Sequence, residues 1–321
     1  MLSIIIPTHQ RTDLLQKCLR AVTRHAPKGS EIVVVDDGSP AAAASATALE
    51  FGAHPVRLRH RRGFAAAANV GIRASRGDIV EMLNDDTEVQ AGWADAALPW
   101  FADETIGAVA PLVLVWPDGK IIDSAGDRYY LGGVAGKRGH GTILPSPPGS
   151  MVGGEGLPLP YTQPCPVFGT SAAAGFYRRS ALARVGLFPE EFGSYFEDVD
   201  LAFRLQRAGF RAMYEPASRV LHHVSASYGR LGRCLIERQS CNEERVFWRN
   251  LPASVLRRAL AKHLAVLLGK AWRRLDEGTL LPWMFGRLRV AWEWQTIMQE
   301  RVPMPSEIDV AAWGIEEPYW S

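Results

Sequence analysis

The sequence contains few cysteines, and none of them stands in an arrangement with a defined chemistry. Its 321 residues include only four, Cys18, Cys165, Cys234 and Cys241. Their spacing fits neither a zinc finger nor a disulfide-rich scaffold. We therefore expect reduced thiols, as in a cytoplasmic protein.

Three other features are missing, and each absence excludes a class of protein. No run of 18 apolar residues occurs, so no segment is expected to cross a bilayer. The chain enters a strand-like sequence at once, without the basic and apolar regions of a signal peptide, so secretion is not expected. A GxGxxG fingerprint near residue 10 is also lacking, which argues against a dinucleotide-dependent oxidoreductase.

The net charge of +2 conceals an uneven distribution of charge. Residues 1–225 are nearly neutral, whereas residues 226–301 carry 14 basic and 7 acidic side chains. The basic segment is also rich in tryptophan, which favours contact with an anionic surface such as a membrane face. The length allows ample hydrophobic core for one large domain or two modest ones.

Short apolar runs alternate with helical patterns over the first hundred residues. The patterns predict strands at 2–7, 31–35, 56–58 and 79–83, and helices at 13–25, 41–51 and 64–74. Such alternation indicates βαβ units and an α/β fold with a parallel sheet flanked by helices. Ligands bind beyond the carboxyl ends of the strands in these sheets. Thr8, Asp36–Asp37 and Asp85–Asp86 all fall there, so we expect them to face one crevice.

The rest of the chain has a different pattern. About a third of residues 117–165 are Gly or Pro, which predicts loops, short antiparallel strands and a mobile lid. From Leu231 onward the pattern is helical. One stripe of the helix at 256–275 is apolar, and most basic residues lie opposite it; the stripe comprises Leu256, Leu260, Leu264, Leu267, Ala271 and Leu275.

The most informative stretch is GSYFEDVDLAFR at 193–204, which places Glu197, Asp198 and Asp200 within four residues at a strand-to-helix junction. Asp198 alone could be a helix cap. Three carboxylates exceed what capping needs, and their mutual repulsion would raise at least one pKa. A carboxylate with a raised pKa suits a general base.

Two further acidic pairs follow predicted strands. Asp36–Asp37–Gly38–Ser39 is either a turn or a contact for a pyrimidine ring or ribose hydroxyl. Asn84–Asp85–Asp86–Thr87 is more specific, because adjacent carboxylates at the end of a buried strand are costly unless a cation or donors offset them. Hard oxygen ligands of this kind hold Mg²⁺ or Mn²⁺. We therefore favour a metal site over turn chemistry at the second pair.

Two segments complete the candidate site. Residues 62–71, RGFAAAANVG, offer either a small-residue approach to a helix N-terminus, which suits a diphosphate, or close packing of a helix on the sheet. His222–His223 follows a strand-like run and places its two side chains on opposite faces. Only one of them can point into the crevice, where a neutral imidazole would complete a metal shell.

Taken in order, five segments resemble family-2 glycosyltransferases of the GT-A fold, and their rhamnosyltransferase-like bacterial branch in particular. The segments are 4–11, 33–39, 62–71, 83–89 and 169–223. The resemblance implies a Rossmann-like, mostly parallel sheet in a GT-A domain at 1–228. Within it, nucleotide-sugar binding would fall at 1–116, the lid at 117–165 and the acceptor and catalytic part at 166–228. A helical region at 229–321 would follow.

The resemblance also implies roles for individual residues. Asp198 would be the general base and Glu197 would orient it. Asp86 would ligate the metal, assisted by Asp85 and His222. The positions expected to contact the nucleotide are Pro7, Thr8, Asp36, Asp37, Arg62, Asn69, Asn84 and Asp85. Asn84 stands where the DXD triplet usually begins with Asp, which leaves one carboxylate fewer.

The implied activity is inverting, Mg²⁺- or Mn²⁺-dependent transfer of a sugar from a nucleotide-diphosphate sugar. The acceptor would be a hydroxyl of a glycan or of a polyprenyl-diphosphate-linked glycan in cell-surface polysaccharide synthesis. No nucleic acid partner is expected. The C-terminal helices would attach the protein to the cytoplasmic membrane face or form a homodimer.

Two alternatives are weighed against this function. A sugar-phosphate nucleotidyltransferase would favour a glycine-rich loop with Arg and Lys near the first strand, whereas this strand runs into Pro7–Thr8–His9. A non-catalytic scaffold of a polysaccharide assembly complex would be indicated by loss of the Asp85–Asp86 pair or of Asp198. All three residues are present.

Overall fold

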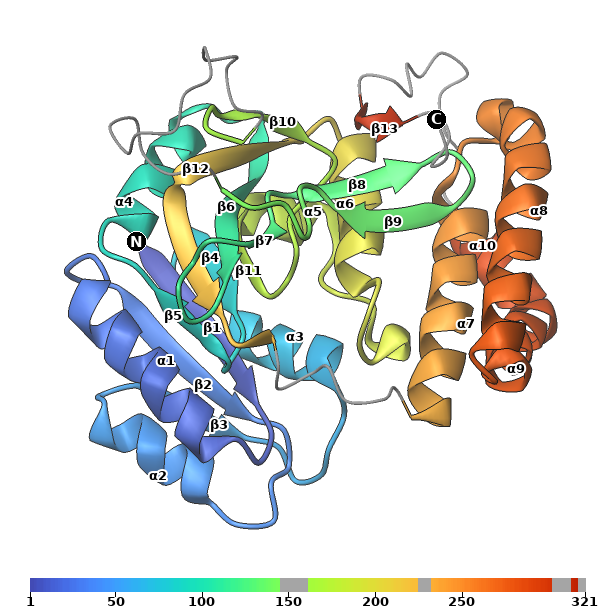
Figure 1. Ribbon diagram of the computed structural model, residues 1–321. Helices are drawn as coiled ribbons and strands as arrows, with labels where there is room; N and C mark the ends of the chain where they lie inside the picture. Colours follow the sequence, from blue (N-terminus) through green and yellow to red (C-terminus); the bar gives the residue numbers. More distant parts are fainter. Residues whose placement is uncertain (145–160, 225–231, 302–312, 317–321) are drawn as a thin grey trace.

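The computed structural model describes residues 1–144, 161–224, 232–301 and 313–316. A central sheet lies between helices, and further helices stand to one side of it (Figure 1). The strand order is β10-β12-β6-β11-β4-β1-β2-β3, with β5 on β12 and β7 on β6. The four strands at the N-terminal edge are parallel: β1 (Leu2–Thr8), β2 (Glu31–Asp36), β3 (His54–Arg57) and β4 (Ile79–Leu83).

Helices cover both faces of this parallel half, as the alternating pattern predicted. The connecting helices are α1 (Thr12–His25), α2 (Ala43–Glu50) and α3 (Phe64–Ala74). The buried side of α1 shares a core with α2 and with α4 (Trp93–Ala97). The alanines of α3 pack into a second core on the opposite face. β4 contributes to both, because Ile79 and Leu83 point to the first core while Val80 and Met82 point to the second.

The other half of the sheet combines parallel and antiparallel strands. β11 (Ala174–Arg178) lies between β4 and β6 (Ile106–Val115) and is antiparallel to both. The long strand β12 (Arg211–His222) runs parallel to β6. Two short strands, β5 (Thr87–Val89) and β10 (Cys165–Val167), pair antiparallel with β12. The sheet is therefore mostly parallel, as expected.

The described residues of the glycine-rich segment include short strands. β7 (Ile122–Ser124) pairs with β6, and β8 (Asp127–Tyr130) pairs with β9 (Val134–Lys137), both antiparallel. A short C-terminal strand, β13 (Ile315–Glu316), joins β8. The predicted short antiparallel strands are confirmed at 122–137, and residues 145–160 of the predicted lid lie outside the described residues.

Two helices with short loops connect β11 to β12. They are α5 (Arg179–Val185) and α6 (Glu197–Arg207), with the 3₁₀ turn η2 (Glu190–Phe192) between them; a further 3₁₀ turn, η1 (Leu98–Ala102), follows α4. α6 lies on the same face as α3, because Leu201 and Leu205 enter the second core. The acidic stretch predicted at a helix entry is thus the first turn of α6.

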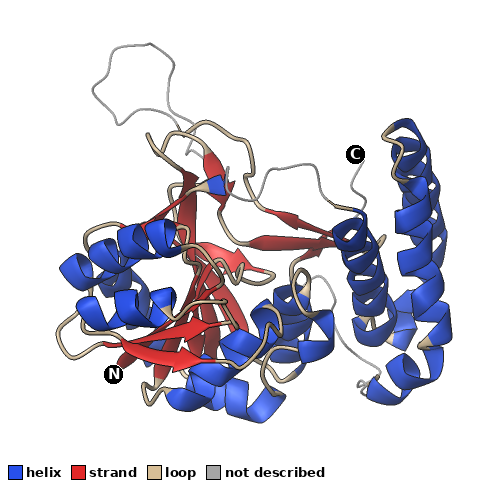
Figure 2. Ribbon diagram, turned by 90° about the horizontal axis from the view of Figure 1, so that it is seen from below, coloured by secondary structure: helices blue, strands red, loops and turns tan. Residues whose placement is uncertain are grey.

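The C-terminal region is helical, as predicted, and belongs to the same body. It comprises α7 (Arg233–Asn250), α8 (Ala253–Asp276), α9 (Leu280–Trp292) and α10 (Trp294–Glu300). Figure 2 shows these helices beside the sheet-containing part. Val246 and Phe247 of α7 share a core with Phe192 and Phe203 around α6. The domain boundary predicted near residue 228 falls at 225–231, outside the described residues.

The apolar stripe predicted for 256–275 does not coincide with the side of α8 that packs against the rest of the protein. Leu260, Leu264 and Leu275 are exposed, whereas Val255, Ala259, His263 and Val266 form the buried side of α8. Periodicity locates a stripe on a helix but does not tell which of two apolar stripes packs inward. None of the helices in the described ranges has the length and hydropathy that a bilayer crossing requires.

Candidate active site

The carboxyl ends of β1 and β4 bring Thr8 against the acidic pair that follows β4. Oγ1 of Thr8 donates a hydrogen bond to Oδ2 of Asp85 at 2.7 Å. Burial raises the pKa of Asp85 to about 6, although the bond from Thr8 acts in the opposite direction. This part of the predicted crevice is therefore formed as expected.

Arg11 is a site residue that the sequence reasoning missed. Its Nη1 lies 3.0 Å from Oδ2 of Asp86 and 3.5 Å from Oδ1 of Asp85. It places a cation against both carboxylates from the loop after β1. The available signal was its position three residues beyond Thr8, in the same strand-end loop.

Asp86 and His222 face each other across the end of the sheet. Nε2 of His222 lies 3.2 Å from Oδ1 of Asp86, and neither buried atom forms a hydrogen bond of normal geometry in the described part of the chain. Burial opposes the charged forms of both groups. Even so, the imidazole and Arg11 hold the pKa of Asp86 below its usual range, and two carboxylates raise the pKa of His222 to about 9.

The second carboxylate beside His222 is Asp123, which lies in the predicted lid. Its Oδ2 is 2.9 Å from Nδ1 of His222, and both of its oxygens accept hydrogen bonds from Nζ of Lys137 at 2.8 and 3.0 Å. His223 turns to the other side of β12, where it meets Glu88 and stacks on Trp116. Of the histidine doublet, only His222 points toward the acidic pair, as predicted.

These residues fit a divalent cation whose remaining ligands come from a substrate. Among the described residues, no group of three or more His, Cys, Asp and Glu side chains forms a ready metal shell. Asp86 and His222 nevertheless direct Oδ1 and Nε2 at one another, and neither atom has a hydrogen bond of normal geometry to a described residue. Mg²⁺ is commonly held by one or two carboxylates together with substrate phosphates and water. Two ligands from the protein would therefore be enough to bind such a cation once a substrate diphosphate is present.

The second acidic centre is the start of α6. Asp198 is the second residue of this helix, not its cap, and its oxygens accept the N–H groups of Ala172 at 3.0 Å and Val199 at 2.9 Å. Burial raises the pKa of Asp198. Burial and the charge of Asp198 together raise the pKa of Glu197 well above its usual range. The elevated carboxylate pKa that the sequence predicted is thus present.

Asp127 joins this pair from β8 and was not anticipated. Its Oδ2 is buried and has no hydrogen-bond partner among the described residues, and burial together with the charge of Asp198 raises its pKa well above the ordinary value. Lys137 lowers the pKa values of Asp127, Asp198 and Asp123. One ammonium group therefore acts on both acidic centres. Asp127 and Lys137 lie far from Asp198 in sequence, so local patterns did not reveal them.

A short backbone segment joins the two centres directly. Ala172 donates its N–H to Asp198, and the carbonyl of the next residue, Ala173, accepts the N–H of Asn84. The segment leads into β11, whose reversed direction places its start beside the end of β4. Two neighbouring residues, Ala172 and Ala173, thus contact the start of α6 and the end of β4 respectively.

Asp200, the third carboxylate of the acidic stretch, is structural. It is fully buried and pairs with Arg204 at 2.7 Å, while Asn250 of α7 donates to its other oxygen at 2.8 Å. Burial opposes the charged form, but Arg204 and Arg249 hold its pKa below the usual value. Asp200 thus connects α6 to the C-terminal helices, and both of its carboxylate oxygens have partners there.

The residues preceding the Glu–Asp pair have an uncommon backbone conformation. Tyr195 and Phe196 have φ angles of 72° and 69°, a region that costs a non-glycine residue of order 1–3 kcal/mol. Nδ2 of Asn242, on α7, donates to the carbonyls of Phe192, Ser194 and Tyr195. The C-terminal helices therefore hold the loop that presents Glu197 and Asp198.

The other acidic pair, after β2, makes hydrogen bonds within the protein. Oδ1 of Asp36 accepts the N–H of Ser39, and Arg57 lies 3.4 Å from its other oxygen. Asp37 accepts the N–H groups of Arg62 and Gly63 at 2.7 and 2.9 Å. A carboxylate thus binds these amides just before α3, where the sequence suggested a diphosphate.

Asn69 and Arg62 both hold the loop before α6. The amide of Asn69 donates to the carbonyl of Phe188 and to Glu190, and its oxygen accepts the N–H of Phe188. Arg62 pairs with Glu190 as well. Within the described chain these two predicted nucleotide contacts therefore bind residues 188–190, and Pro7 is a buried residue of β1.

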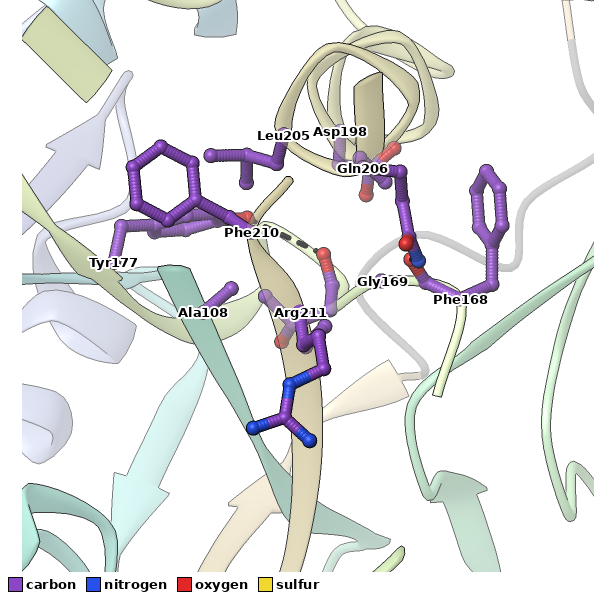
Figure 3. A pocket seen from close by; sticks show the side chains of 12 residues that line it. Ala108, Phe168, Gly169, Tyr177, Asp198, Leu205, Gln206, Phe210 and Arg211 are labelled. Atoms are coloured by element: carbon purple, nitrogen blue, oxygen red, sulfur yellow. Dashed lines mark hydrogen bonds between the residues drawn. The ribbon is translucent and has the colours of Figure 1, made fainter. Parts of the chain in front are cut away.

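A narrow cavity under α6 is separate from the strand-end carboxylates. Figure 3 shows Asp198 among residues that are mostly apolar, including Tyr177, Leu205 and Phe210. Neither Asp85 nor Asp86 lines it. It is too narrow to hold a nucleotide, so the strand ends remain the better place for a donor.

The central sheet and the helices that flank it have the architecture of the GT-A fold. Residues 3–154 match the family described as Glycosyl transferase family 2, so this part of the chain is a domain of that family. The pre-mycofactocin glycosyltransferase of Mycobacterium tuberculosis is 30% identical over 68% of this chain. The N-acetylglucosaminyl-diphospho-decaprenol L-rhamnosyltransferase of the same species is 28% identical over 72% of this chain and 78% of its own length.

A solved structure supports the fold. The mannosyltransferase PcManGT from Pyrobaculum calidifontis, in complex with GDP-Man and Mn²⁺, superposes with a TM-score of 0.56 over 90% of this chain and 74% of its own, at 19% identity. Some relatives are much longer than this chain. It spans 42% of the pre-mycofactocin glycosyltransferase and 25% of a relative from Sinorhizobium fredii.

Proposed function

We propose that this chain transfers a sugar, with inversion, from a nucleotide-diphosphate sugar to a hydroxyl of a glycan or polyprenyl-diphosphate-linked glycan. One observation carries the proposal. The backbone of Ala172–Ala173 hydrogen bonds to Asp198 on one side and to Asn84, two residues before Asp86, on the other, and Asp86 faces His222 at 3.2 Å. A cation-binding centre for the diphosphate and a basic centre for the acceptor are thereby held at a fixed separation.

In this proposal the donor lies beyond the ends of β1, β2 and β4. Thr8, Asn84 and one or both of Asp36 and Asp37 contact the nucleoside or ribose. Asp86 and His222, assisted by Asp85, hold Mg²⁺ or Mn²⁺, which would offset the charge on the departing diphosphate. Arg11 turns from the acidic pair to the diphosphate. Arg62 and Asn69 act on the donor through the loop at 188–190.

Asp198 is the proposed general base. It removes the proton from the acceptor hydroxyl while that oxygen forms a bond to C1 of the sugar. The bond between C1 and the diphosphate oxygen breaks on the opposite face, so the anomeric configuration is inverted. Glu197 and Asp127, both with raised pKa values, orient Asp198, and Lys137 limits how far its pKa rises.

The acceptor and the setting are proposed from the relatives. The printed name of one relative, a transferase acting on N-acetylglucosaminyl-diphospho-decaprenol, supports a polyprenyl-linked acceptor and a role in cell-surface polysaccharide synthesis. Such an acceptor is embedded in a bilayer, so the enzyme would work peripherally at the cytoplasmic face of the membrane. A homodimer through the C-terminal helices is the competing use of that region.

The first experiment is a panel of nucleotide sugars assayed for hydrolysis with Mn²⁺, with Mg²⁺ and with chelator. We expect hydrolysis of one donor that requires the cation. Nucleoside diphosphate affinity should fall in Asp86→Ala when the cation is present and change little in excess chelator. Equal nucleotide affinity of the wild type with and without cation would overturn metal dependence. Formation of a nucleotide sugar from sugar phosphate would instead favour the nucleotidyltransferase alternative.

A further inference from the structure

The helices α8 and α9 expose large apolar side chains along the sides that face away from α7. Both helices lie on the far side of α7 from the central sheet (Figure 1). The exposed residues are Leu260, Leu264, Leu268, Trp272 and Leu275 on α8, and Leu281, Met284, Phe285, Leu288 and Trp292 on α9. We call these ten residues the outer face. Leu268 is 65% exposed and Trp292 is 93% exposed.

The outer face is not needed for packing, because each helix buries its opposite side. α8 packs His263 onto Phe247 and hydrogen bonds it to Glu244 of α7. On α9, Arg287 pairs with Glu243 and Glu244. With their inner sides fixed to α7, both helices hold their leucines, phenylalanine and tryptophans toward solvent. Large apolar side chains exposed in this number mark an interaction site.

The charges beside the outer face identify the chemistry of its partner. Residues 253–292 carry eight basic and two acidic side chains. Five of the basic side chains pair with glutamates of the protein: Lys270, Arg273, Arg274, Arg287 and Arg289. Arg257 is exposed, and helical spacing places it in line with Leu264. Arg273 follows Trp272, and its side chain is 75% exposed. Apolar residues flanked by Arg, with tryptophans among them, suit the boundary between lipid headgroups and acyl chains.

We propose that the outer face of α8 and α9 docks on an anionic lipid surface. This inference rests on the proposed function and specifies its partner, namely the leaflet that holds a lipid-linked acceptor. Leu268, Phe285 and Trp292 enter the headgroup region, and the arginines meet lipid phosphates. A second copy of the chain fits less well, because its own outer face would bring further arginines against these rather than acidic groups.

Docking on this face would also orient the reactive centre. The outer face is fixed to α7 by the buried pairs of Glu243 and Glu244. α7 in turn holds the loop before Glu197 and Asp198 through Asn242. A surface that binds the outer face is therefore connected to the proposed base by two helices and one loop.

The test uses the full chain and vesicles made with phosphatidylcholine alone or with added phosphatidylglycerol. The variant Leu268→Glu/Phe285→Glu/Trp292→Glu alters the outer face. Leu49→Glu is the matched control, because Leu49 is also 65% exposed but lies on α2. A third variant, Arg257→Gln/Arg258→Gln, tests the charge. Thermal unfolding of each variant checks that the fold is retained.

We expect the wild type and Leu49→Glu to sediment with anionic vesicles at low salt and to dissociate as salt rises. The outer-face triple variant should bind about tenfold less or weaker still, and the arginine variant should lose its salt dependence. Lipids brominated near the headgroup should quench wild-type tryptophan fluorescence and quench the triple variant less.

Absence of wild-type binding at low salt would overturn the proposal, as would equal binding by the triple variant and Leu49→Glu. A wild-type dimer that the triple variant converts to monomer, without vesicle binding, would assign the outer face to a second copy instead. Hydrolysis of the soluble donor is measured without vesicles in the same preparations. Failure of membrane docking is thereby distinguished from failure of the proposed transferase function.

Discussion

Asp123 holds Nδ1 of His222 at 2.9 Å, although the two residues are 99 positions apart. The bond fixes the imidazole so that its other nitrogen faces Asp86. Metal-binding histidines usually have such a carboxylate partner, and loss of the partner weakens binding even though it never touches the ion. Asp123 is therefore a positioning residue for the proposed cation site.

Asp123→Asn should lower affinity for Mn²⁺ by about 10- to 100-fold. The amide has the same shape but lacks the charge that orients the imidazole and binds Lys137. Electron paramagnetic resonance of free Mn²⁺ measures the affinity without any turnover. Asp118→Asn is the control, since Asp118 is an exposed residue nearby. Unchanged Mn²⁺ affinity with intact thermal stability would show that Asp123 has no such role.

Asp198→Asn should slow transfer by about 10²- to 10⁴-fold, the usual contribution of a general base, while nucleoside diphosphate affinity stays the same. Because the pKa of Asp198 is raised, the wild-type rate should fall with decreasing pH through a pKa above that of an ordinary aspartate. The residual rate of the variant should lack this acid limb. Measurement of kcat and kcat/KM against pH for both proteins tests this prediction. Near-normal turnover by Asp198→Asn would exclude Asp198 as the base.

Glu81→Gln should stabilise the protein at neutral and alkaline pH. Glu81 is fully buried in β4, where Oε1 accepts a hydrogen bond from Trp93 and Oε2 has no partner within the described ranges. Burial raises its pKa from 4.5 to about 8. The folded protein thus keeps a proton that the unfolded chain releases above about pH 4.5, and the free energy of unfolding falls as pH rises through this window.

The gain of Glu81→Gln over the wild type should be near zero at pH 4.5 and reach at most about 3 kcal/mol near pH 7. Urea unfolding at several pH values measures this difference. A gain that is independent of pH would mean that packing, rather than the charge of Glu81, causes it.

Regular elements of the parallel half could be predicted because their determinants are local. The helix predicted at 64–74 coincides with α3, and the strand predicted at 79–83 coincides with β4. Apolar periodicity and the residues at element ends decide both. The direction of β11 was not predicted, because it depends on pairing with strands that lie far away in the sequence.

In the candidate site, too, residues in local motifs could be predicted and residues that act across the fold could not. Asp85, Asp86, Asp198 and His222 could be named from short motifs, and the fold brings the first two together with His222. Arg11, Asp123 and Lys137 escaped prediction because each acts on a residue from a distant segment. Asp200 resembled its neighbours in sequence, yet its surroundings make it structural. On α8 the hydrophobic spacing was correct, but the choice of buried side depends on how α7 packs.

Asn242→Ala should lower stability by about 2–4 kcal/mol and also reduce kcat. The substitution leaves three loop carbonyls without their buried donor, so Tyr195 and Phe196 can relax toward ordinary backbone conformations and move the Glu–Asp pair. Ser240→Ala is a control in the same helix, because Ser240 bonds to Trp283 of α9 instead. Loss of stability with unchanged kcat in Asn242→Ala would show that the loop needs no such support.

The single peptide step between Ala172 and Ala173 has a consequence for how this enzyme can diversify. A gain or loss of one residue there would shift Asn84 relative to Asp198, and with them the proposed cation site relative to the proposed base. Natural or engineered variation should therefore accumulate by substitution at this step and by insertion elsewhere, as in the glycine-rich segment after β6. Libraries aimed at new donors or acceptors are best built on that segment, with 171–173 kept at constant length.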